Sequence, residues 1–229
     1  IARESDYILY THAGPEIAVA STKAYTAQLS CLYLLAFQFA FVRGKLSEAE
    51  CIEQLKQLQE VIPAVEDTLL LEDNLKEISH ALSKAEDLFF IGRGLDYALS
   101  MEGSIKLKEI SYIHSEAYAA GELKHGTLSL VTEGTPVIAL ATQSNVYSKM
   151  ISNIREVRAR GAMVILITNG LANADDSIYN YHIALPLLPD DFTPFTAAVV
   201  LQMLAYYTSV HRDLNVDQPR NLAKSVTVE

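Results

Sequence analysis

Residues 136–168 have the sequence PVIALATQSNVYSKMISNIREVRARGAMVILIT. Two short apolar runs, Pro136–Ala141 and Met163–Thr168, lie on either side of a stretch with helical spacing, Asn145–Arg160. Strands that are apolar at nearly every position are typical of a sheet covered on both faces. A strand, a crossover helix and a second strand of this kind form a unit whose two strands are parallel. This stretch therefore predicts a parallel sheet.

The same alternation extends to both sides of this unit. The other expected strands are Tyr7–Thr11, Leu88–Ile91 and Tyr181–Leu185, and the other expected helices are Thr22–Phe41, Ser47–Leu70, Asp73–Lys84, Ala98–Ile113 and Pro194–Arg212. Strands that alternate with helices predict an α/β fold in which helices sandwich the sheet. The polar stretch Glu72–Lys84 separates two groups of elements, so we expect two layered units, the first of which begins only at its last strands.

Composition and charge restrict the class of protein. The chain has 229 residues, enough for one large or two small domains, and half of them are hydrophobic, as in an ordinary globular protein. A net charge of −10 disfavours nucleic acid as a general partner. A small anionic substrate remains compatible, because a local site can be positive within an acidic protein.

No feature of the sequence indicates export or a membrane. The most apolar stretch, Leu29–Val42, is interrupted by Ser30 and Gln38, and we expect a buried helix there instead of a membrane span. The two cysteines, Cys31 and Cys51, lack the spacing of a metal or redox pair. With no apolar leader at Ile1, we expect a cytoplasmic protein.

The expected helix Ala98–Ile113 carries an unusual stripe of charges. Glu102, Lys106 and Glu109 have the spacing i, i+4, i+7 and therefore lie on one side of the helix, among apolar neighbours. Charges in such a place indicate a cleft, where a carboxylate such as Glu109 could act as a base beside Lys106. A purely structural ladder of ion pairs is the alternative interpretation.

Two histidines near this helix are candidates for a functional role. His125 lies between glycines in a loop, where an imidazole can approach a ligand closely, although most loop histidines are simply solvated. His114 directly follows the helix, so we expect it to cap the last carbonyls. No histidine has metal-binding spacing.

Two further segments are ambiguous. Thr142–Ser144 leaves a strand and opens a helix, so its amides and hydroxyls suit either a phosphate or an ordinary helix cap. The segment 215–224, NVDQPRNLAK, ends in Lys224. That lysine suits Schiff-base chemistry if the tail folds over a site, and plain solvation if it does not.

Three longer motifs resemble one family. Residues 106–126, KLKEISYIHSEAYAAGELKHG, residues 19–24, VASTKA, and residues 217–229, DQPRNLAKSVTVE, are similar to the isomerase half of the glutamine–fructose-6-phosphate aminotransferase (glucosamine-6-phosphate synthase) family. The motifs have the same order and span the chain. Thr127 is a small departure, since some relatives have proline after the histidine and glycine.

The resemblance implies a tandem of two sugar-isomerase (SIS) domains. Residues 1–72 would be the C-terminal part of the first with connecting helices, residues 78–219 the second, and residues 220–229 a catalytic tail. The family's glutaminase domain and the phosphate loop of the first SIS domain are absent from the sequence, so we expect the chain alone to be inactive.

The resemblance also implies site residues. Glu109 matches the base that moves a proton between the first two sugar carbons, Lys106 the lysine beside it, and Lys224 the Schiff-base lysine. His125 matches a ring-opening histidine that the other subunit of a dimer supplies. The residues implied to contact the sugar are Val19, Ala20 and Ser21. Fructose 6-phosphate would be converted to glucosamine 6-phosphate without a metal or redox cofactor.

Two rival interpretations remain. One is a SIS enzyme of another activity, such as a deaminase or deglycase of a phosphorylated amino sugar, against which the sequence of the tail argues. The other is a non-catalytic SIS module that binds a phosphosugar and regulates a partner. The presence together of Glu109, His125 and Lys224 argues against that second rival.

Overall fold

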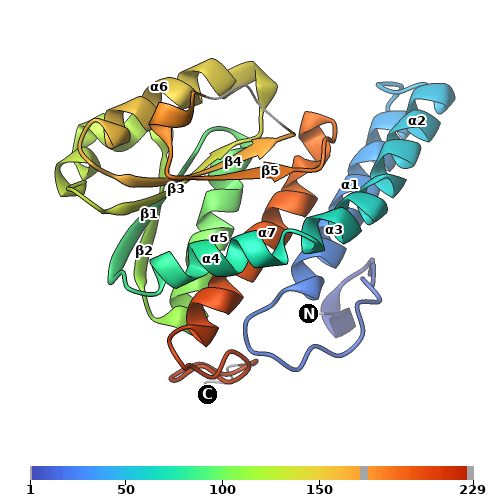
Figure 1. Cartoon of the computed structure of the whole chain (residues 1–229). Coiled ribbons are helices and arrows are strands. Elements are labelled where there is room, and N and C mark those ends of the chain that lie inside the picture. Colours follow the sequence, from blue (N-terminus) through green and yellow to red (C-terminus); the bar gives the residue numbers. More distant parts are fainter. Residues whose placement is uncertain (1, 171–174, 226–229) are drawn as a thin grey trace.

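A computed structural model describes residues 2–170 and 175–225. Its centre is a five-stranded sheet in the order β2-β1-β3-β4-β5, in which every pair of neighbours is parallel. The strands are β1 (Asp87–Gly92), β2 (His114–Ala119), β3 (Pro136–Ala141), β4 (Met163–Asn169) and β5 (Tyr181–Leu185). Helices lie on both faces of this sheet (Figure 1), so the predicted α/β sandwich is confirmed.

Alternate residues of β1, β3 and β4 are buried in two separate cores, one on each face of the sheet. One core joins the sheet to α4 (Glu72–Leu82), α5 (Leu95–Ser111) and α7 (Thr193–Val210), and Phe90 lies in it. The other joins the opposite face to α6 (Tyr147–Arg158) and the short helix η2 (Ala120–His125), and Phe89 lies in it. The sheet is therefore covered on both sides, which is the reason its inner strands β1, β3 and β4 are almost continuously apolar.

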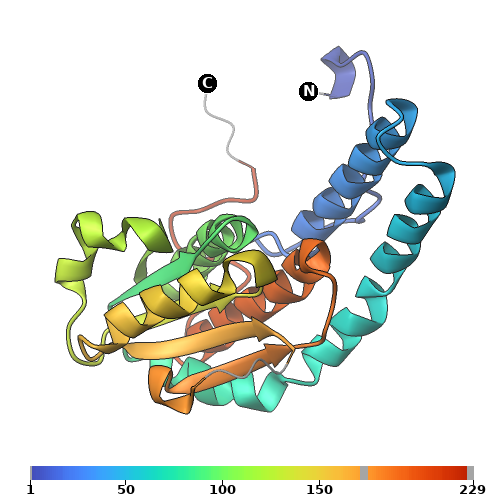
Figure 2. The same ribbon diagram turned by 90° about the horizontal axis from the view of Figure 1, so that it is seen from above.

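The N-terminal third forms an arm beside this sandwich. A segment without regular structure, residues 5–22, leads into α1 (Lys23–Val42), which is followed by α2 (Glu48–Gln59) and α3 (Val61–Leu69). We call residues 5–22 the N-terminal strap. In both views α1 and α2 extend away from the sheet, and α3 leads back toward α7 (Figures 1 and 2). A small cluster that includes Phe192 and Phe195 fastens the arm to α7.

Helix α1 differs from its expectation. None of its residues is buried, so the prediction of a buried helix is wrong. Its one packed side contacts the body through Tyr33, whose ring stacks on Phe192. By length and apolar composition alone α1 could cross a membrane, but helices of soluble cores and signal sequences meet the same criterion.

Three further elements differ from what the sequence predicted. The expected strand Tyr7–Thr11 is wrong: its residues are exposed in the strap, and no strand of the described part pairs with them. Strand β2 was not predicted, because its sequence HSEAYA is too polar to stand out. The expected helix Ser47–Leu70 is divided at Glu60, since Pro63 has no N–H to continue the hydrogen bonds of α2. Residues 1 and 226–229, at the outer ends of the two predicted terminal segments, lie outside the described part.

Candidate functional site

Small residues bring α5 close to the core. A Cβ at Gly103 would lie 3.0 Å from side-chain atoms of Leu201 and Phe90, so a larger residue would force these side chains to shift and glycine allows the close approach of α5 to α7 and β1. The Ser104 hydroxyl donates to the Ser115 carbonyl oxygen at 2.9 Å, which ties the helix to β2. The helix is thus held rigidly by its uncharged side, and its charged stripe has a fixed position.

The three charges of the stripe contact one another, as their spacing predicts. Lys106 Nζ lies 2.9 Å from a Glu109 oxygen and 3.7 Å from a Glu102 oxygen, and the Lys106 side chain is only 8% exposed. Burial raises the pKa of Glu102, and the charge of Glu109 adds to this while Lys106 opposes it. Lys106 is thus a buried cation that lies between two carboxylates.

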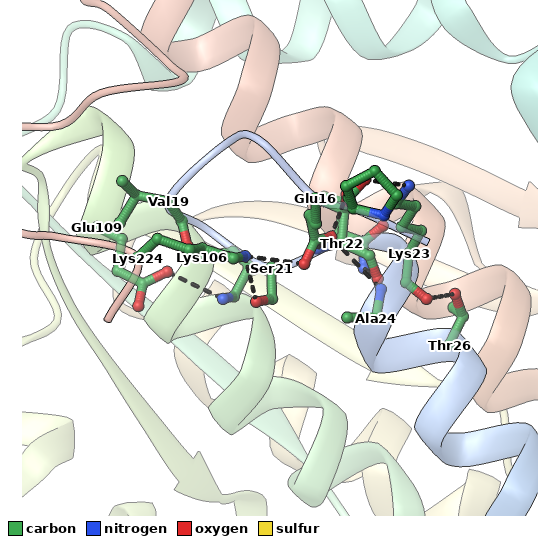
Figure 3. Close-up of polar contacts among 12 residues, drawn as sticks. Glu16, Val19, Ser21, Thr22, Lys23, Ala24, Thr26, Lys106, Glu109 and Lys224 are labelled. Carbon is green, nitrogen blue, oxygen red and sulfur yellow. Dashed lines mark hydrogen bonds and ion pairs between the residues drawn. The ribbon is translucent and has the colours of Figure 1, made fainter. Parts of the chain in front are cut away.

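Lys224 lies against the N-terminal strap. Its Nζ is 2.8 Å from a Glu16 oxygen, 3.0 Å from the Ser21 hydroxyl and 3.4 Å from the Val19 carbonyl oxygen (Figure 3). Lys224 therefore makes specific contacts while 38% of its side chain remains exposed, which favours a tail folded against the strap over a freely solvated one. The same contacts place it beside two of the three residues expected to touch the sugar.

Sequence reasoning missed Glu16. Its carboxylate also accepts a hydrogen bond from the Thr22 amide at 2.8 Å and a longer one from the Ala24 amide at 3.4 Å, at the start of α1. Burial opposes its ionised form, but the hydrogen bonds from Lys224 and from these amides outweigh burial and lower the pKa of Glu16 to about 2. The only signal in the sequence was a carboxylate shortly before a helix, which is also the pattern of ordinary capping.

A small cavity of about 170 Å³ joins the strap, the tail, α5 and α7. Its lining comes from all four: Ala18, Ala20, Thr22, Lys106, Ile110, Gln202, Ala205, Tyr206, Val216 and Asp217. Ala20 is buried in the same core as Ile110. The Val19 amide donates to the Asp217 carbonyl oxygen at 3.0 Å. The strap therefore contacts Lys224 and shares the lining of this cavity with Lys106.

Tyr112 anchors the tail to the end of α5. It adopts a left-handed conformation with φ of 61°, which ends the helix. Its hydroxyl accepts a hydrogen bond from the Arg220 amide at 2.7 Å, and the Arg220 guanidinium lies 4.2 Å from the centre of its ring. A cation over an aromatic face adds to the attraction, so the tail is fixed shortly before Lys224.

The two histidines lie outside this cluster. His125 ends η2, is 75% exposed and is 3.9 Å from a carboxylate oxygen of Glu122. His114 begins β2, and its ring contacts Asp87 at 2.7 Å, so the expectation that it caps the helix is wrong. Within residues 2–170 and 175–225, no three His, Cys, Asp or Glu side chains gather closely enough to hold a metal ion.

Comparison with known proteins gives relatives over the whole chain. The isomerizing glutamine–fructose-6-phosphate aminotransferase of Caldanaerobacter subterraneus subsp. tengcongensis is 51% identical over 229 residues, and that of Methanosarcina acetivorans is 47% identical over 232. Both alignments cover all of this chain. The chain spans only 38% and 37% of the length of these relatives.

Solved structures share the fold. The C-terminal domain of glucosamine-fructose-6-phosphate aminotransferase from Francisella tularensis superimposes with a TM-score of 0.89 at 38% identity, covering 95% of this chain and 61% of that one. Glucosamine-6-phosphate deaminase from Thermotoga maritima, at 22% identity and a TM-score of 0.70, covers 99% of this chain and 63% of that one and is alike in fold alone. The SIS domain family matches residues 1–38 and 81–212. With this match over most of its length, the chain belongs to the SIS domain family.

Proposed function

We propose that the chain is the sugar-isomerising part of a glutamine–fructose-6-phosphate aminotransferase. The substrates would be fructose 6-phosphate and ammonia released from glutamine, and the product glucosamine 6-phosphate. The observation that carries the proposal is the convergence of Lys224 and the Lys106–Glu109 pair on the strap, which Lys224 contacts and which lines a cavity together with Lys106. Identity of about half to relatives of that activity supports it.

The chemistry assigns one task to each group. Glu109 would take the proton from the first sugar carbon and return a proton to the second, which converts a ketose skeleton to an aldose skeleton. Its partner Lys106 carries a positive charge that stabilises the negative charge developing during this transfer. A positioned general base contributes about 10²–10⁴-fold to a rate.

Lys224 must lose a proton before it can react as a nucleophile. In the ion pair with Glu16 it is an ammonium ion, which has no lone pair. To form a Schiff base it must lose a proton, attack the ketose carbonyl carbon and release the carbonyl oxygen as water. We infer that entry of the sugar separates Lys224 from Glu16, and that Ser21 and the Val19 carbonyl oxygen then become available to sugar hydroxyls.

The remaining assignments follow from the same proposal. Residues 1–72 would complete a first SIS domain with preceding sequence, residues 78–219 form the second, and residues 220–229 the catalytic tail. The exposed His125 suits delivery into the site of a second subunit of a homodimer. A glutaminase domain of the same protein would supply the ammonia, and we place the protein in the cytoplasm.

The first experiment replaces Glu109 by glutamine in the full-length protein. Isomerisation should fall by about 10²–10⁴-fold while phosphosugar binding persists, because glutamine keeps the shape and removes the base. Glu77→Gln on the exposed side of α4 is the matched control and should retain full activity. Near-normal turnover of Glu109→Gln would remove Glu109 from the mechanism.

A second experiment traps the Schiff base. Borohydride reduction of the full-length protein with fructose 6-phosphate should attach the sugar to Lys224, as read by mass spectrometry. An adduct on Lys106, or none, would contradict the assignment.

A third experiment uses the 229-residue chain alone. It should neither bind fructose 6-phosphate at micromolar concentration nor form product from ammonia, and calorimetry with a product assay tests this.

A further inference from the structure

The sheet has a crevice at the carboxyl ends of β1 and β3. From β1 the chain passes through α5 to β2 at one side, and from β3 it passes through α6 to β4 at the other. The two connections diverge, and open α/β sheets hold their ligands outside the carboxyl ends of the strands at such a point. The polar groups at this point are those of Thr142, Gln143 and Ser144, between β3 and α6.

Two carboxylates of the chain already occupy these groups. Asp96 accepts hydrogen bonds from the Thr142 amide at 2.8 Å and the Thr142 hydroxyl at 2.6 Å. Asp190 accepts from the Ser144 amide at 2.7 Å and the Ser144 hydroxyl at 2.6 Å. These amides and hydroxyls at the start of a helix are the donors that a phosphate would use, at the same short distances.

We propose that Asp96 and Asp190 act as internal anions that fill the ligand crevice of this sheet and exclude phosphosugars from it. The crevice would otherwise be suited to a phosphorylated ligand. Beside it lies a cavity of about 500 Å³, lined by Ala141, Thr142, Ser144, Tyr147, Asn169, Leu187, Leu188 and Asp190. The Tyr147 hydroxyl is buried and has no hydrogen-bond partner among the described residues, so an unused donor is present as well.

Charge and burial make the exclusion strong. Asp96 is 1% exposed and cannot move aside without leaving a buried carboxylate unpaired. Burial raises the pKa of Asp96 to about 6, and the negative charge of Asp190 contributes to that rise. Two carboxylates that already repel each other would repel a phosphate dianion more strongly. The sheet would then serve only as a scaffold for the site beside α5. The chain would bind no second phosphosugar in the crevice at the carboxyl ends of β1 and β3.

The test is a titration of the ¹⁵N-labelled chain with inorganic phosphate, and then with fructose 6-phosphate, followed at the Ser144 amide by NMR. The native chain should show no saturating shift. Asp190→Ala should gain saturable phosphate binding in the millimolar range, because it frees two donors and removes a negative charge. Asp190→Asn should gain little, because its neutral oxygen still accepts both hydrogen bonds. Asp191→Ala, at the exposed neighbour, is the control.

The outcomes are decisive in both directions. Saturable binding at Ser144 in the native chain would overturn the proposal, as would a folded Asp190→Ala chain without any gain. If Asp190→Ala does not fold, Asp190→Ser takes its place, and the titration of the native chain still decides. The readout at Ser144 is independent of Lys106, Glu109 and Lys224, so failure here leaves the proposed function untouched.

Discussion

Replacing Glu16 by glutamine should release Lys224 from the strap. Glutamine keeps an oxygen that can accept from the amides of Thr22 and Ala24, and it removes only the negative charge that Lys224 Nζ contacts at 2.8 Å. The change therefore isolates the ion pair from the local capping of α1.

The size of the effect follows from the pKa of Glu16. A fall from 4.5 to about 2 corresponds to about 3 kcal/mol in favour of the ionised form. The Thr22 and Ala24 amides account for part of this shift. The side chains of Glu16 and Lys224 are 10% and 38% exposed, so that solvent screening of the lysine lowers the contribution of the ion pair further, to about 1–2 kcal/mol. That range is equivalent to a change of about 5–30-fold in the docking equilibrium of the tail.

The sign of the pH dependence is fixed by the lowered pKa. The stabilisation is complete above the unfolded pKa of 4.5 and is almost entirely lost by pH 2, where about half of the folded carboxylate and nearly all of the unfolded one is protonated. Glu16→Gln should therefore differ from the native chain at pH 7 and come close to it at pH 2.

The Val19 amide reports on docking, because it donates to the Asp217 carbonyl oxygen of the tail. Its hydrogen exchange, corrected for the intrinsic rate, should be about 5–30-fold faster in Glu16→Gln at pH 7. Glu66→Gln, at an exposed position of α3, should leave it unchanged. Equal protection at pH 7, or a difference that persists at pH 2, would refute the reasoning.

Three other perturbations test separate parts of the structure. Gly92→Ala should lower the free energy of unfolding by more than about 3 kcal/mol in urea titration, because its Cβ would lie 2.4 Å from the Asp96 backbone. Gly44→Ala, with φ of +64° and open space around it, should cost only about 1 kcal/mol. Asp96 has a folded pKa raised from 3.8 to about 6, so stability should fall as the pH rises through that window, and Asp96→Asn should flatten the slope. In the full-length protein, mixing inactive Glu109→Gln and His125→Asn subunits should restore about a quarter of the native rate if His125 acts across a dimer, since half of the dimers are mixed and one of their two sites is intact; no recovery would place His125 in its own subunit's site.

Local pattern predicted the parts of the fold whose signals are local. The strands β1, β3, β4 and β5 are short and mostly apolar, and this composition distinguished them from the longer helices. Strand β2 has only one neighbour in the sheet and only one fully buried residue, Ser115, so no apolar run marks it. The run Tyr7–Thr11 has the residues of a strand, but pairing depends on a neighbouring strand, which local sequence does not contain.

In the candidate site, too, the contacts between residues close in sequence were predicted and those between distant residues were not. The contacts of Lys106 with Glu102 and Glu109 lie within one helix, and helical spacing predicted them. The contact of Lys224 with Glu16 joins residues 208 positions apart. No periodicity connects such distant positions, so only the resemblance of the tail to the family indicated that Lys224 belongs to a site.

The ion pair between Glu16 and Lys224 also has a consequence for how the protein is made. During translation Glu16 leaves the ribosome 208 residues ahead of Lys224, which at ordinary speeds of synthesis is about 10–40 s. For all of that time the carboxylate has only the nearby groups of Thr22 and Ala24 to hold it. The cluster around the strap is thus among the last parts of the nascent chain to be assembled. The ion pair can form only after all five strands of the sheet have been synthesised.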